Sequence, residues 1–510
     1  MKVFKLSKVN NSQAKYLQLA ETVRCAIRQG QLTAGDKLPS VKSISEDLGL
    51  NRHTVMKSLA ELVAEGWIES IQRVGYKVVP NLPIENSQTH TFCNATEYNS
   101  HIDYRFVRSG CQLPSHPANE FEYNFSGGQP DLALFPFDEF KRCMSDVLTR
   151  PNVSQLSYGQ SAGTPELIAQ VKLYLRKSRA IIDREIVITN GSQEALFIVA
   201  QLLLHSGDKV AVEELGYPPA MAAFSRTGAD LVGIKHDAQG MCSDDLNMQI
   251  LKGNVRLIYL TPLHQYPTTV TLTVSRRMAI YQLAAKHKIP IVEDDYDHEF
   301  HYRCQPLAPM ATQDPAQLVI YLSTFSKIMF PGARIGIMAV SKQMAKAVTE
   351  YRLLICHKSN VLMQSALAKW MENGGFERHL RRTTRVNMQR RDHAVLVMKK
   401  YACFEFTVPD GGMALWVKLK EGVKLKEEVQ LQQAIDVNQT SPSPSAKALA
   451  KRCQQVGIYV QHEKQYQLNK KSNRDSFIRL GFAGMSEKKF ALGIELLVQC
   501  LMSQGQSQRP

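Results

Sequence analysis

The amino-acid sequence predicts an α/β protein with a small N-terminal domain of three helices and a β-hairpin. A large domain follows, in which helices cover both faces of a mostly parallel sheet. Three observations lead to this prediction. The 510 residues exceed one ordinary domain. Apolar residues recur at helical spacing in the first eighty residues. From residue 121 onward, short apolar runs alternate with amphipathic segments, as in proteins with parallel sheets.

Composition and charge narrow the class of protein. Hydrophobic residues make up 44% of the chain, enough for a large core, and no apolar run reaches the ~20 residues that a membrane span needs. The N-terminus lacks the apolar segment of a secretory signal, so we expect a cytoplasmic protein without a membrane partner. The ten cysteines are scattered without a C-x-x-C pair, which favours reduced thiols over a metal site or disulfides. A net charge of +15 is compatible with a polyanionic partner.

The first domain, residues 1–80, has the pattern of a helix-turn-helix followed by a hairpin. Ser40 and Asn51 stand where side chains cap the second and third helices. The alternating tail around Arg73 and Gly75 predicts a two-stranded wing. The predicted helical segments are residues 15–32, 41–50 and 52–66, and the hairpin is residues 67–79.

A winged helix-turn-helix predicts DNA binding. Its third helix enters the major groove with its first residues nearest the bases. Residues 1–80 carry twelve Lys/Arg against seven Asp/Glu, a charge of the sign that phosphates attract. We therefore expect double-stranded DNA as a partner; a small helical bundle with an ordinary charged surface is the alternative. The candidate DNA-contacting residues are Ser40, Lys42, Arg52, His53, Thr54, Lys57, Arg73 and Gly75.

Three segments have a biased composition. Residues 81–120 are polar and contain prolines without a repeat, which predicts a flexible linker before the large domain at 121–505. Residues 420–446 are rich in Gln, Ser and Pro, which predicts a flexible insertion away from any site. Residues 377–392 hold six arginines. A solvated helix face is the favoured interpretation there, and a secondary DNA or inter-domain contact is the alternative.

Polar residues cluster where the apolar runs of the large domain end. Open α/β sheets place their binding sites at the carboxyl ends of strands. We therefore expect the glycine at 191, the acidic residues before Tyr296, and Lys327 to lie in one site. The runs are EIVITNG at 185–191, KVAVEE at 209–214, LIYLTP at 257–262, PIVEDDY at 290–296 and VIYLSTF at 319–325.

The residue types at these strand ends match the needs of pyridoxal 5'-phosphate. That cofactor requires a lysine for its imine bond, a carboxylate for its ring nitrogen, a donor for its ring oxygen and a cradle for its phosphate. Lys327, Asp294 and Tyr296 can supply the first three. The cradle is expected from Gly191, Ser192, Gln193, Ser326 and Arg334, where a helix start offers backbone N–H groups. Each residue alone has an ordinary interpretation, such as a surface lysine or a solvated strand end. The occurrence of all of them in this order, each at the end of a strand, indicates the cofactor.

The stretch GQLTAGDKLPSVKSISEDLGLNRHTVMKSLAELVAEGWIE at residues 30–69 resembles the signature of GntR-type winged-helix regulators. Two positions depart from that signature: Lys42 replaces the usual Arg, and Asn51 replaces the Ser before Arg52. Lysine keeps the charge but lacks the bidentate fork of arginine. Phosphate contact by Lys42 is therefore expected, whereas its discrimination between bases is not.

The large domain is similar to fold-type I aminotransferases over residues 120–500, and the whole chain resembles MocR-type regulators, in which a GntR-type head precedes such a domain. The motifs are YGQSAGTPEL, VEELGYPP, TPLHQYPT and FIRLGFAG. The resemblance implies that Tyr217 lies against the cofactor ring and that Tyr158 reaches the phosphate site of a partner subunit in a homodimer. It also implies that Arg479 binds an α-carboxylate and that a smaller α+β subdomain ends the chain.

Several positions depart from the family pattern. Thr269 stands where Gly is usual, and Ser323 stands where Gly usually precedes T-F-S-K. Pro218 and Pro219 occupy the place of an Arg that takes a second carboxylate in a GABA-responsive member of the group. A GABA-type ligand is therefore not expected. None of these changes touches Lys327.

These expectations combine into a transcriptional regulator that senses pyridoxal phosphate, or an amine or amino acid that reacts with it, through imine (aldimine) chemistry at Lys327. A ligand that favours one conformation of the large domain would change DNA binding. An aminotransferase with an accessory DNA-binding domain is the alternative, and a dimerisation scaffold is a third hypothesis. A residual transamination half-reaction is compatible with the residues present. Neither the effector nor the operator follows from the sequence.

Overall fold

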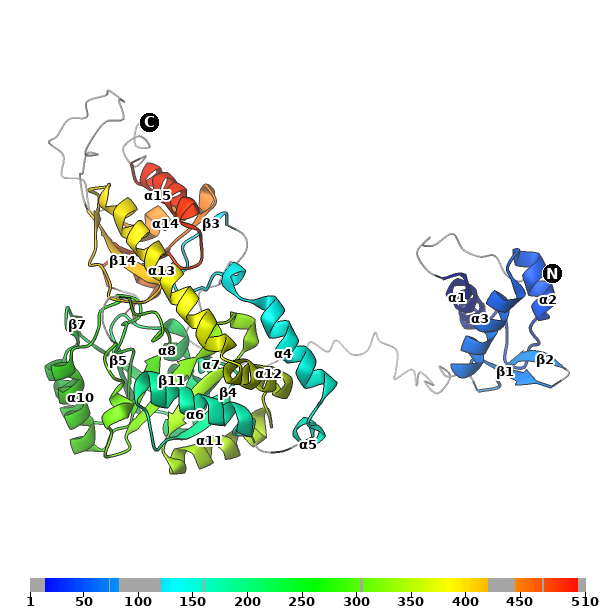
Figure 1. Ribbon diagram of the computed structural model, residues 1–510, viewed down its shortest axis with the longest axis horizontal. Helices are drawn as coiled ribbons and strands as arrows, with labels where there is room; N and C mark the ends of the chain where they lie inside the picture. Colours follow the sequence, from blue (N-terminus) through cyan, green and yellow to red (C-terminus); the bar gives the residue numbers. More distant parts are fainter. Residues whose placement is uncertain are drawn as a thin grey trace, which may run out of the picture. The chain divides into compact units, whose positions relative to one another are not determined.

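The computed structural model describes residues 14–72, 74–81, 121–157, 159, 161–302, 306–420, 445–469 and 472–502. The chain divides near residue 106 into two compact units (Figure 1), and each has its own hydrophobic core. The linker expected at 81–120 and the insertion expected at 420–446 fall almost wholly outside the described residues, as do Arg73 and Tyr158.

The N-terminal unit is a winged helix-turn-helix, as predicted. Ser40 Oγ accepts a hydrogen bond from the Ser43 N–H at 3.1 Å, and Asn51 Oδ1 accepts one from the His53 N–H at 2.9 Å. Each cap satisfies a backbone donor at a helix start, so Ser40 and Asn51 fix where the second and third helices begin. The elements are α1 (Lys15–Arg28), α2 (Val41–Leu48), α3 (Arg52–Ala64) and the antiparallel strands β1 (Ile68–Ile71) and β2 (Gly75–Val78).

The core of this unit determines which side of α3 remains exposed. Apolar residues at helical spacing on α1 and α3 are buried against each other, and Trp67 and Val78 close the core from the wing. Because the apolar stripe of α3 faces inward, the polar residues of its first turn are left on the surface. The buried helical residues include Leu19, Val23, Ile27, Val55, Leu59 and Leu62.

The large unit is built on a seven-stranded sheet with the order β4-β12-β11-β10-β9-β5-β6. Only β12 among these strands runs antiparallel to its neighbours, so the sheet is mostly parallel, as predicted. The sequence prediction finds five strands and misses β6 and β12. The strands are β4 (Glu185–Thr189), β5 (Lys209–Glu213), β6 (Asp230–Ile234), β9 (Val255–Leu260), β10 (Ile291–Asp295), β11 (Val319–Thr324) and β12 (Gly336–Val340).

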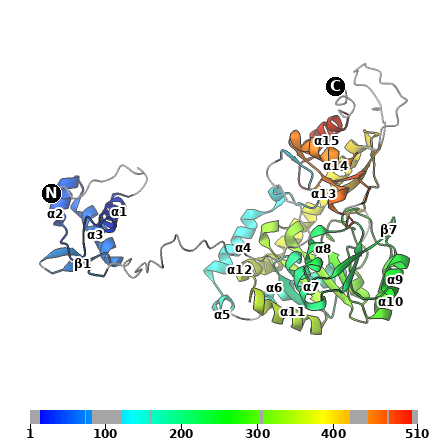
Figure 2. The ribbon, with the colours of Figure 1, turned by 180° about the vertical axis from the view of Figure 1, so that it is seen from behind.

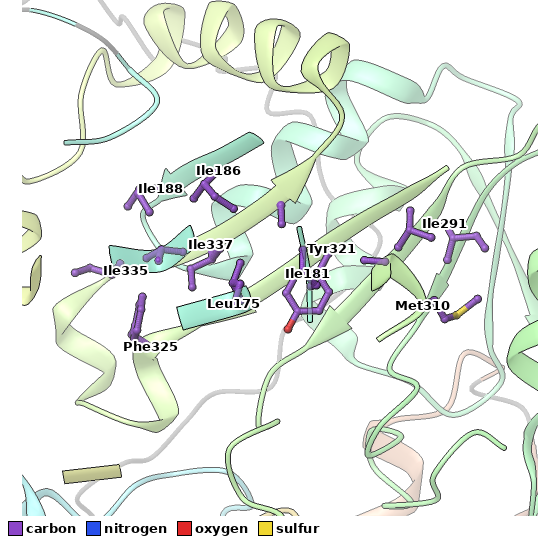
Figure 3. Packing of buried hydrophobic residues seen from close by; sticks show 14 of the residues in the cluster. Leu175, Ile181, Ile186, Ile188, Ile291, Met310, Tyr321, Phe325, Ile335 and Ile337 are labelled. Carbon is purple, nitrogen blue, oxygen red and sulfur yellow. The ribbon is translucent and has the colours of Figure 1, made fainter. Parts of the chain in front are cut away.

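Alternate residues of these strands enter two separate cores, one on each face of the sheet. Ile186, Ile291 and Tyr321 belong to one core, part of which Figure 3 shows, and Val187 and Val292 belong to the other. Helices α6, α10 and α12 contribute to the first core, and α7, α8 and α11 to the second (Figures 1 and 2). The bounds are α6 (Pro165–Arg179), α7 (Ser192–Leu203), α8 (Pro218–Ser225), α9 (Ser243–Leu251), α10 (Val274–His287), α11 (Lys342–Ile355) and α12 (Val361–Glu372).

A smaller α+β subdomain ends the chain, as predicted. Its antiparallel sheet has the order β13-β14-β17-β16, and the long helix α13 (Gly375–Lys399) connects it to the large sheet (Figure 1). The strands β3 (Tyr123–Asn124) and β15 (Ile458–Tyr459) pair beside it. The remaining elements are α4 (Phe137–Thr149), α5 (Val153–Leu156), β7 (His236–Asp237), β8 (Gly240–Met241), β13 (Phe404–Glu405), β14 (Ala414–Leu419), α14 (Ala446–Gln455), β16 (Gln461–His462), β17 (Phe477–Gly481) and α15 (Glu487–Met502).

Several arginines of the arginine-rich segment of α13 make contacts inside the large unit. The sequence predicts either a solvated helix face or a secondary DNA or inter-domain contact there. Arg378 pairs with Glu139 at 2.6 Å, and Arg390 pairs with Asp131 at 2.7 Å. Arg391 is fully buried and donates to a backbone carbonyl at 3.2 Å. Arg382 donates to the backbone carbonyl of Leu134. Arg378, Arg382 and Arg390 therefore tie α13 to α4 and the segment before it, and with Arg391 at least four of the six arginines make contacts within the large unit.

No helix in the described part of the chain has the length and apolar character to cross a membrane. No disulfide joins any of the described cysteines, which are Cys25, Cys143, Cys242, Cys356, Cys403, Cys453 and Cys500.

Candidate functional site

The candidate site lies where neighbouring strands of the large sheet reach their carboxyl ends. β10 ends with two aspartates, and β11 runs into the short 3-10 helix η3 (Phe325–Lys327). The two strands are paired, with Asp294 opposite Leu322. The fold thereby brings Asp294 and Lys327 close enough for their charges to interact.

Lys327 has the properties of a nucleophile. Its side chain is half-buried, and burial together with the positive charge of Arg479 lowers the pKa of its amine to about 8. The nearby carboxylates of Asp297 and Asp294 oppose this shift only in part. A Cβ at Gly128 would lie 3.4 Å from Lys327 Nζ, so the chain at residue 128 closes over the amine. At neutral pH the amine of Lys327 is therefore neutral more often than that of an ordinary lysine.

Asp294 is a buried carboxylate with one unused oxygen. Tyr259 Oη donates to its Oδ2 at 2.9 Å, whereas Oδ1 has no partner within the described structure. Burial raises the pKa of Asp294 to about 7. A buried acceptor without a partner is uncommon, so Oδ1 is suited to a donor that a ligand brings.

The start of α7 provides an anion cradle. Gly191 has a φ of 87°, which a residue with a side chain rarely adopts, and it lies against the guanidinium of Arg334. Arg334 Nη2 donates to Asn190 O at 2.6 Å, and the arginine remains exposed. Nearby, Thr324 Oγ1 accepts from the Ser326 N–H at 3.2 Å. Free N–H groups at a helix start and a planar arginine are the groups that bind phosphate.

The side chains of Gln193 and Tyr296 form hydrogen bonds to backbone carbonyls that the sequence does not predict. Gln193 Nε2 donates to Pro219 O at 3.0 Å, which leaves its Oε1 without a partner in the described chain. Tyr296 Oη donates to His264 O at 3.0 Å. Its hydroxyl proton is thus directed to the backbone in this conformation.

Tyr266 forms the centre of an aromatic wall that the sequence analysis does not assign. Its ring stands edge-on to Tyr217 at 5.2 Å and to Tyr296 at 5.9 Å. The guanidinium of Arg479 lies over the same ring, 4.3 Å from its centroid. The wall therefore connects two predicted cofactor residues with the predicted carboxylate-binding arginine.

Arg479 is a buried cation without an acidic partner. It lies on β17, is 1% exposed, and its Nε and Nη1 make no hydrogen bond within the described structure. A side chain at position 127 would overlap its guanidinium, which explains a glycine at Gly127. A buried cation is costly unless it is paired. Arg479 is therefore suited to an incoming carboxylate.

Sequence reasoning misses Gly127 and Gly128, although each backs one of the two predicted functional side chains. The double glycine in FSGGQPD, just after the predicted linker, is the signal that could have identified them. It also misses the pair formed by His264 Nδ1 and Asp297 Oδ1, which are 2.7 Å apart.

The candidate DNA-contacting residues lie on α2, α3 and the wing. Arg52 and His53 are exposed in the first turn of α3, and Thr54 is half-buried. Lys57 is exposed with its Nζ 4.1 Å from the centroid of the Tyr16 ring. The other candidates are Lys42, which is exposed and 3.9 Å from Glu46, Gly75 at the start of β2 with a φ of 106°, and Ser40, whose hydroxyl is used as a cap.

The comparisons with known proteins join these two parts. Residues 15–78 match the bacterial regulatory proteins of the gntR family. A probable rhizopine catabolism regulatory protein, MocR of Rhizobium meliloti, is 31% identical over 402 residues, which cover 78% of this chain and 80% of that protein. The chain belongs to the MocR-type transcription regulators. The HTH-type transcriptional regulator TauR of Rhodobacter capsulatus is also similar, at 27% identity over 71% of this chain and 74% of its own.

The large domain of this MocR-type regulator has an aminotransferase fold. The structure of Pyrococcus horikoshii kynurenine aminotransferase, in complex with PMP, matches it with a TM-score of 0.67 and 25% identity, over 76% of this chain and 93% of that one. The predicted family and the predicted fold class are thereby confirmed: the chain is a DNA-binding regulator that carries an aminotransferase-like domain.

One departure from the aminotransferase pattern has a visible effect. Thr269, at a position where Gly is usual, has a φ of 64°. That conformation is uncommon for a β-branched residue, and the Thr269 N–H donates to Gln265 O at 2.7 Å. The turn of this MocR-type regulator thus keeps a glycine-like shape without the glycine.

We expect Lys327 to react with small electrophiles at a lower pH than surface lysines. Its amine becomes neutral and nucleophilic above its lowered pKa of about 8, whereas an unperturbed lysine has a pKa of ~10.4. Reductive methylation of the cofactor-free protein, followed by mass spectrometry, should give a rate at Lys327 that rises with a midpoint near pH 8. Lys488, exposed on α15, serves as the reference lysine. Parallel profiles for the two lysines would contradict this prediction.

Proposed function

We propose that this MocR-type regulator holds pyridoxal 5'-phosphate at Lys327 and changes its DNA binding when an amino acid enters the same site. The observation that carries the proposal is the grouping of a low-pKa lysine with two buried groups that lack partners, Asp294 Oδ1 and the Arg479 guanidinium. Leaving a buried polar group unpaired costs on the order of 1–3 kcal/mol. Both groups therefore favour a ligand that pairs with them.

The residues present fit the cofactor. Lys327 offers an amine for the covalent link, Asp294 Oδ1 offers an acceptor for a protonated ring nitrogen, and the start of α7 offers N–H groups for phosphate. When bound, pyridoxal phosphate supplies an electron-withdrawing ring that activates an amino group. The other proposed contacts are Gly191, Ser192, Gln193, Ser326 and Arg334 at the phosphate, Tyr217 and Tyr296 at the ring, and Tyr158 from a second subunit.

Arg479 favours an amino acid over a plain amine as the effector. A carboxylate would pair with a cation that is already buried. A plain amine would leave Arg479 unpaired and add positive charge beside Lys327, where the two cations already interact unfavourably. Pro218 and Pro219 begin α8 without a cationic side chain, which argues against a second carboxylate on the ligand.

A bound amino acid would connect the two subdomains of the large unit. Lys327 lies on η3, directly after β11 of the large sheet, whereas Arg479 lies on β17 of the C-terminal sheet. A ligand that contacts both residues binds more tightly when the subdomains are close together. That difference in affinity is what a ligand needs to shift a conformational equilibrium.

A homodimer is part of the proposal. Apolar side chains are exposed along the chain from residue 132 to α5, and Val153 is 73% exposed. Apolar surface gathered in this way commonly marks an interface. Two subunits would also present two winged helices to two half-sites of an operator. The exposed residues are Leu132, Phe137, Leu148, Val153 and Leu156.

An aminotransferase with an accessory DNA-binding domain is the second candidate function. The same lysine and arginine favour it, because Lys327 and Arg479 can serve a reaction as well as a sensor. Turnover distinguishes the two: sustained transamination at about 1–1000 per second would favour the enzyme.

We expect the winged helix, residues 1–80, to carry the sequence-specific DNA binding of the protein. Deleting residues 1–80 should abolish sequence-specific binding to fragments that the full-length protein selects from genomic DNA. Arg52→Ala removes an exposed cation from the first turn of α3 and should weaken specific binding by about tenfold, because a base or phosphate contact is worth ~1–3 kcal/mol. Met56→Ala, 56% exposed on the same helix, is the matched control. Fluorescence anisotropy measures each affinity, and specific binding by the truncated protein would overturn the assignment.

The cofactor prediction concerns Lys327. Lys327→Ala should eliminate the visible absorbance of the lysine-bound cofactor, because no other described side chain takes its place beside Asp294. Operator affinity without effector should stay within about twofold of the wild type, because the winged helix has its own core. Absorbance spectra and anisotropy measure the two effects. A purified wild type that shows no such absorbance after incubation with pyridoxal phosphate would refute the cofactor assignment.

A further inference from the structure

A loop that the sequence analysis assigns to no site brings a tyrosine beside Arg479. Tyr466 follows the 3-10 helix η5 (Glu463–Gln465), and its carbonyl oxygen accepts from the Gly216 N–H at 3.0 Å. The next residue forms a β-bridge with Leu215. The loop is thereby held against the segment that carries Tyr217, at the edge of the candidate site.

The hydroxyl of Tyr466 is buried beside that of Tyr266. Tyr466 is 2% exposed, and the Tyr266 hydroxyl interacts with its Oη, yet this Oη forms no hydrogen bond of ordinary length and angle in the described part of the molecule. The ring packs against Trp416, with 5.9 Å between centroids, and belongs to a small apolar cluster with Leu215. The side chains of Trp416 and Leu215 supply no acceptor, and the nearby Tyr266 hydroxyl forms no hydrogen bond of ordinary geometry with Oη. A carboxylate oxygen brought by a ligand would give this buried hydroxyl a strong acceptor.

Tyr466 and Arg479 lie around the same aromatic ring. The Tyr466 ring stands edge-on to Tyr266, with 5.5 Å between centroids, and the Arg479 guanidinium lies 4.3 Å from the Tyr266 centroid. Burial raises the pKa of the Tyr466 phenol, so its hydroxyl keeps its proton, and the Arg479 cation is close enough to oppose that shift. One O–H and two nitrogens of a guanidinium are therefore buried beside Tyr266 and make no hydrogen bond of ordinary geometry with any described residue. A carboxylate is the ligand group that accepts from both kinds of donor.

We propose that the Tyr466 hydroxyl donates a hydrogen bond to the carboxylate that Arg479 binds, and thereby sets the preference of the site for amino acids over amines. This role rests on the proposed function, because it requires the effector to occupy the site beside Lys327. Arg479 supplies the charge. Tyr466 supplies a donor whose position is fixed by the packing of its ring, and Tyr266 supplies the platform between them.

Tyr466→Phe tests the role with the full-length, cofactor-loaded protein. The probes are three amino acids and the amines that lack their carboxylates: L-alanine and ethylamine, L-leucine and isopentylamine, L-phenylalanine and phenethylamine. Calorimetric titration should show affinity for the amino acids falling about tenfold or more, the size of a lost hydrogen bond to a charged acceptor, with affinity for the amines unchanged. The melting temperature without ligand should stay the same or rise, because the lost hydroxyl has no partner. Cofactor absorbance should be unchanged.

Two control variants separate the possible outcomes. Arg479→Gln should reduce amino-acid affinity more than Tyr466→Phe does. Tyr401→Phe, in the C-terminal subdomain beside Phe404, should leave every affinity unchanged. Equal amino-acid affinity in the wild type and Tyr466→Phe would overturn the role of Tyr466 and leave the proposed function intact. A wild type that loads cofactor but binds none of the three amino acids would overturn both.

Discussion

A buried, unpaired guanidinium is the constraint on which the site of the large domain depends. Arg479 is 1% exposed, and no carboxylate among the described residues pairs with it. The ring of Tyr266 offers its electron-rich face to the cation, and Gly127 leaves the space that the guanidinium fills. These contacts compensate the lost hydration only in part. The site is thus organised around a charge that a ligand carboxylate would neutralise, and in the proposed function this pairing favours the conformation in which the two subdomains are close together.

The acidic run Glu293–Asp295 at the end of β10 shows how three neighbouring carboxylates acquire different roles. Glu293 accepts two backbone N–H groups at 2.8 and 3.0 Å and fixes the loop that follows. Asp295 accepts from Tyr321 Oη at 2.5 Å; burial works against its ionisation, but His298 and a nearby arginine hold its pKa below the usual range. Asp294, between them, points to the site and keeps one oxygen free. The two flanking carboxylates hold the strand end, so that Asp294 is positioned for a ligand.

Much of this arrangement follows from local sequence. Polar residues stand at the end of four strands, β4, β5, β10 and β11, and directly after β9. These strand ends share one edge of the sheet, which is why Lys327 and Asp294 can be grouped from their positions in the sequence alone. The β12 strand is missed because GIMAV is short, apolar and uniformly buried, with no alternation to indicate its pairing. The bond from Tyr296 Oη to the His264 carbonyl is not predictable either, since it depends on how a loop of the neighbouring strand is placed.

Residues whose role depends on tertiary packing are the hardest to predict from the sequence. Tyr466 is separated from Tyr266 by two hundred residues, and only the C-terminal subdomain brings them together. The double glycine at 127 and 128 indicates a close approach of the backbone, but only the structure shows that Gly127 makes room for Arg479. For the arginines of α13, the sequence instead suggests too much free surface. The charged run predicts a solvated face, whereas Arg378 and Arg390 hold the helix to the start of the large domain. Spacing alone does not distinguish an exposed arginine from one that pairs across two subdomains.

The most direct test of sensing is the operator affinity of the cofactor-loaded, full-length protein, measured with and without a saturating amino acid that binds at Arg479. Operator affinity should change by about five- to 150-fold, and amino-acid affinity should change by the same factor when operator is bound, because coupling between two sites is reciprocal. Unchanged operator affinity, in a protein that transaminates the same amino acid at ordinary enzyme rates, would show that the site serves catalysis and not sensing.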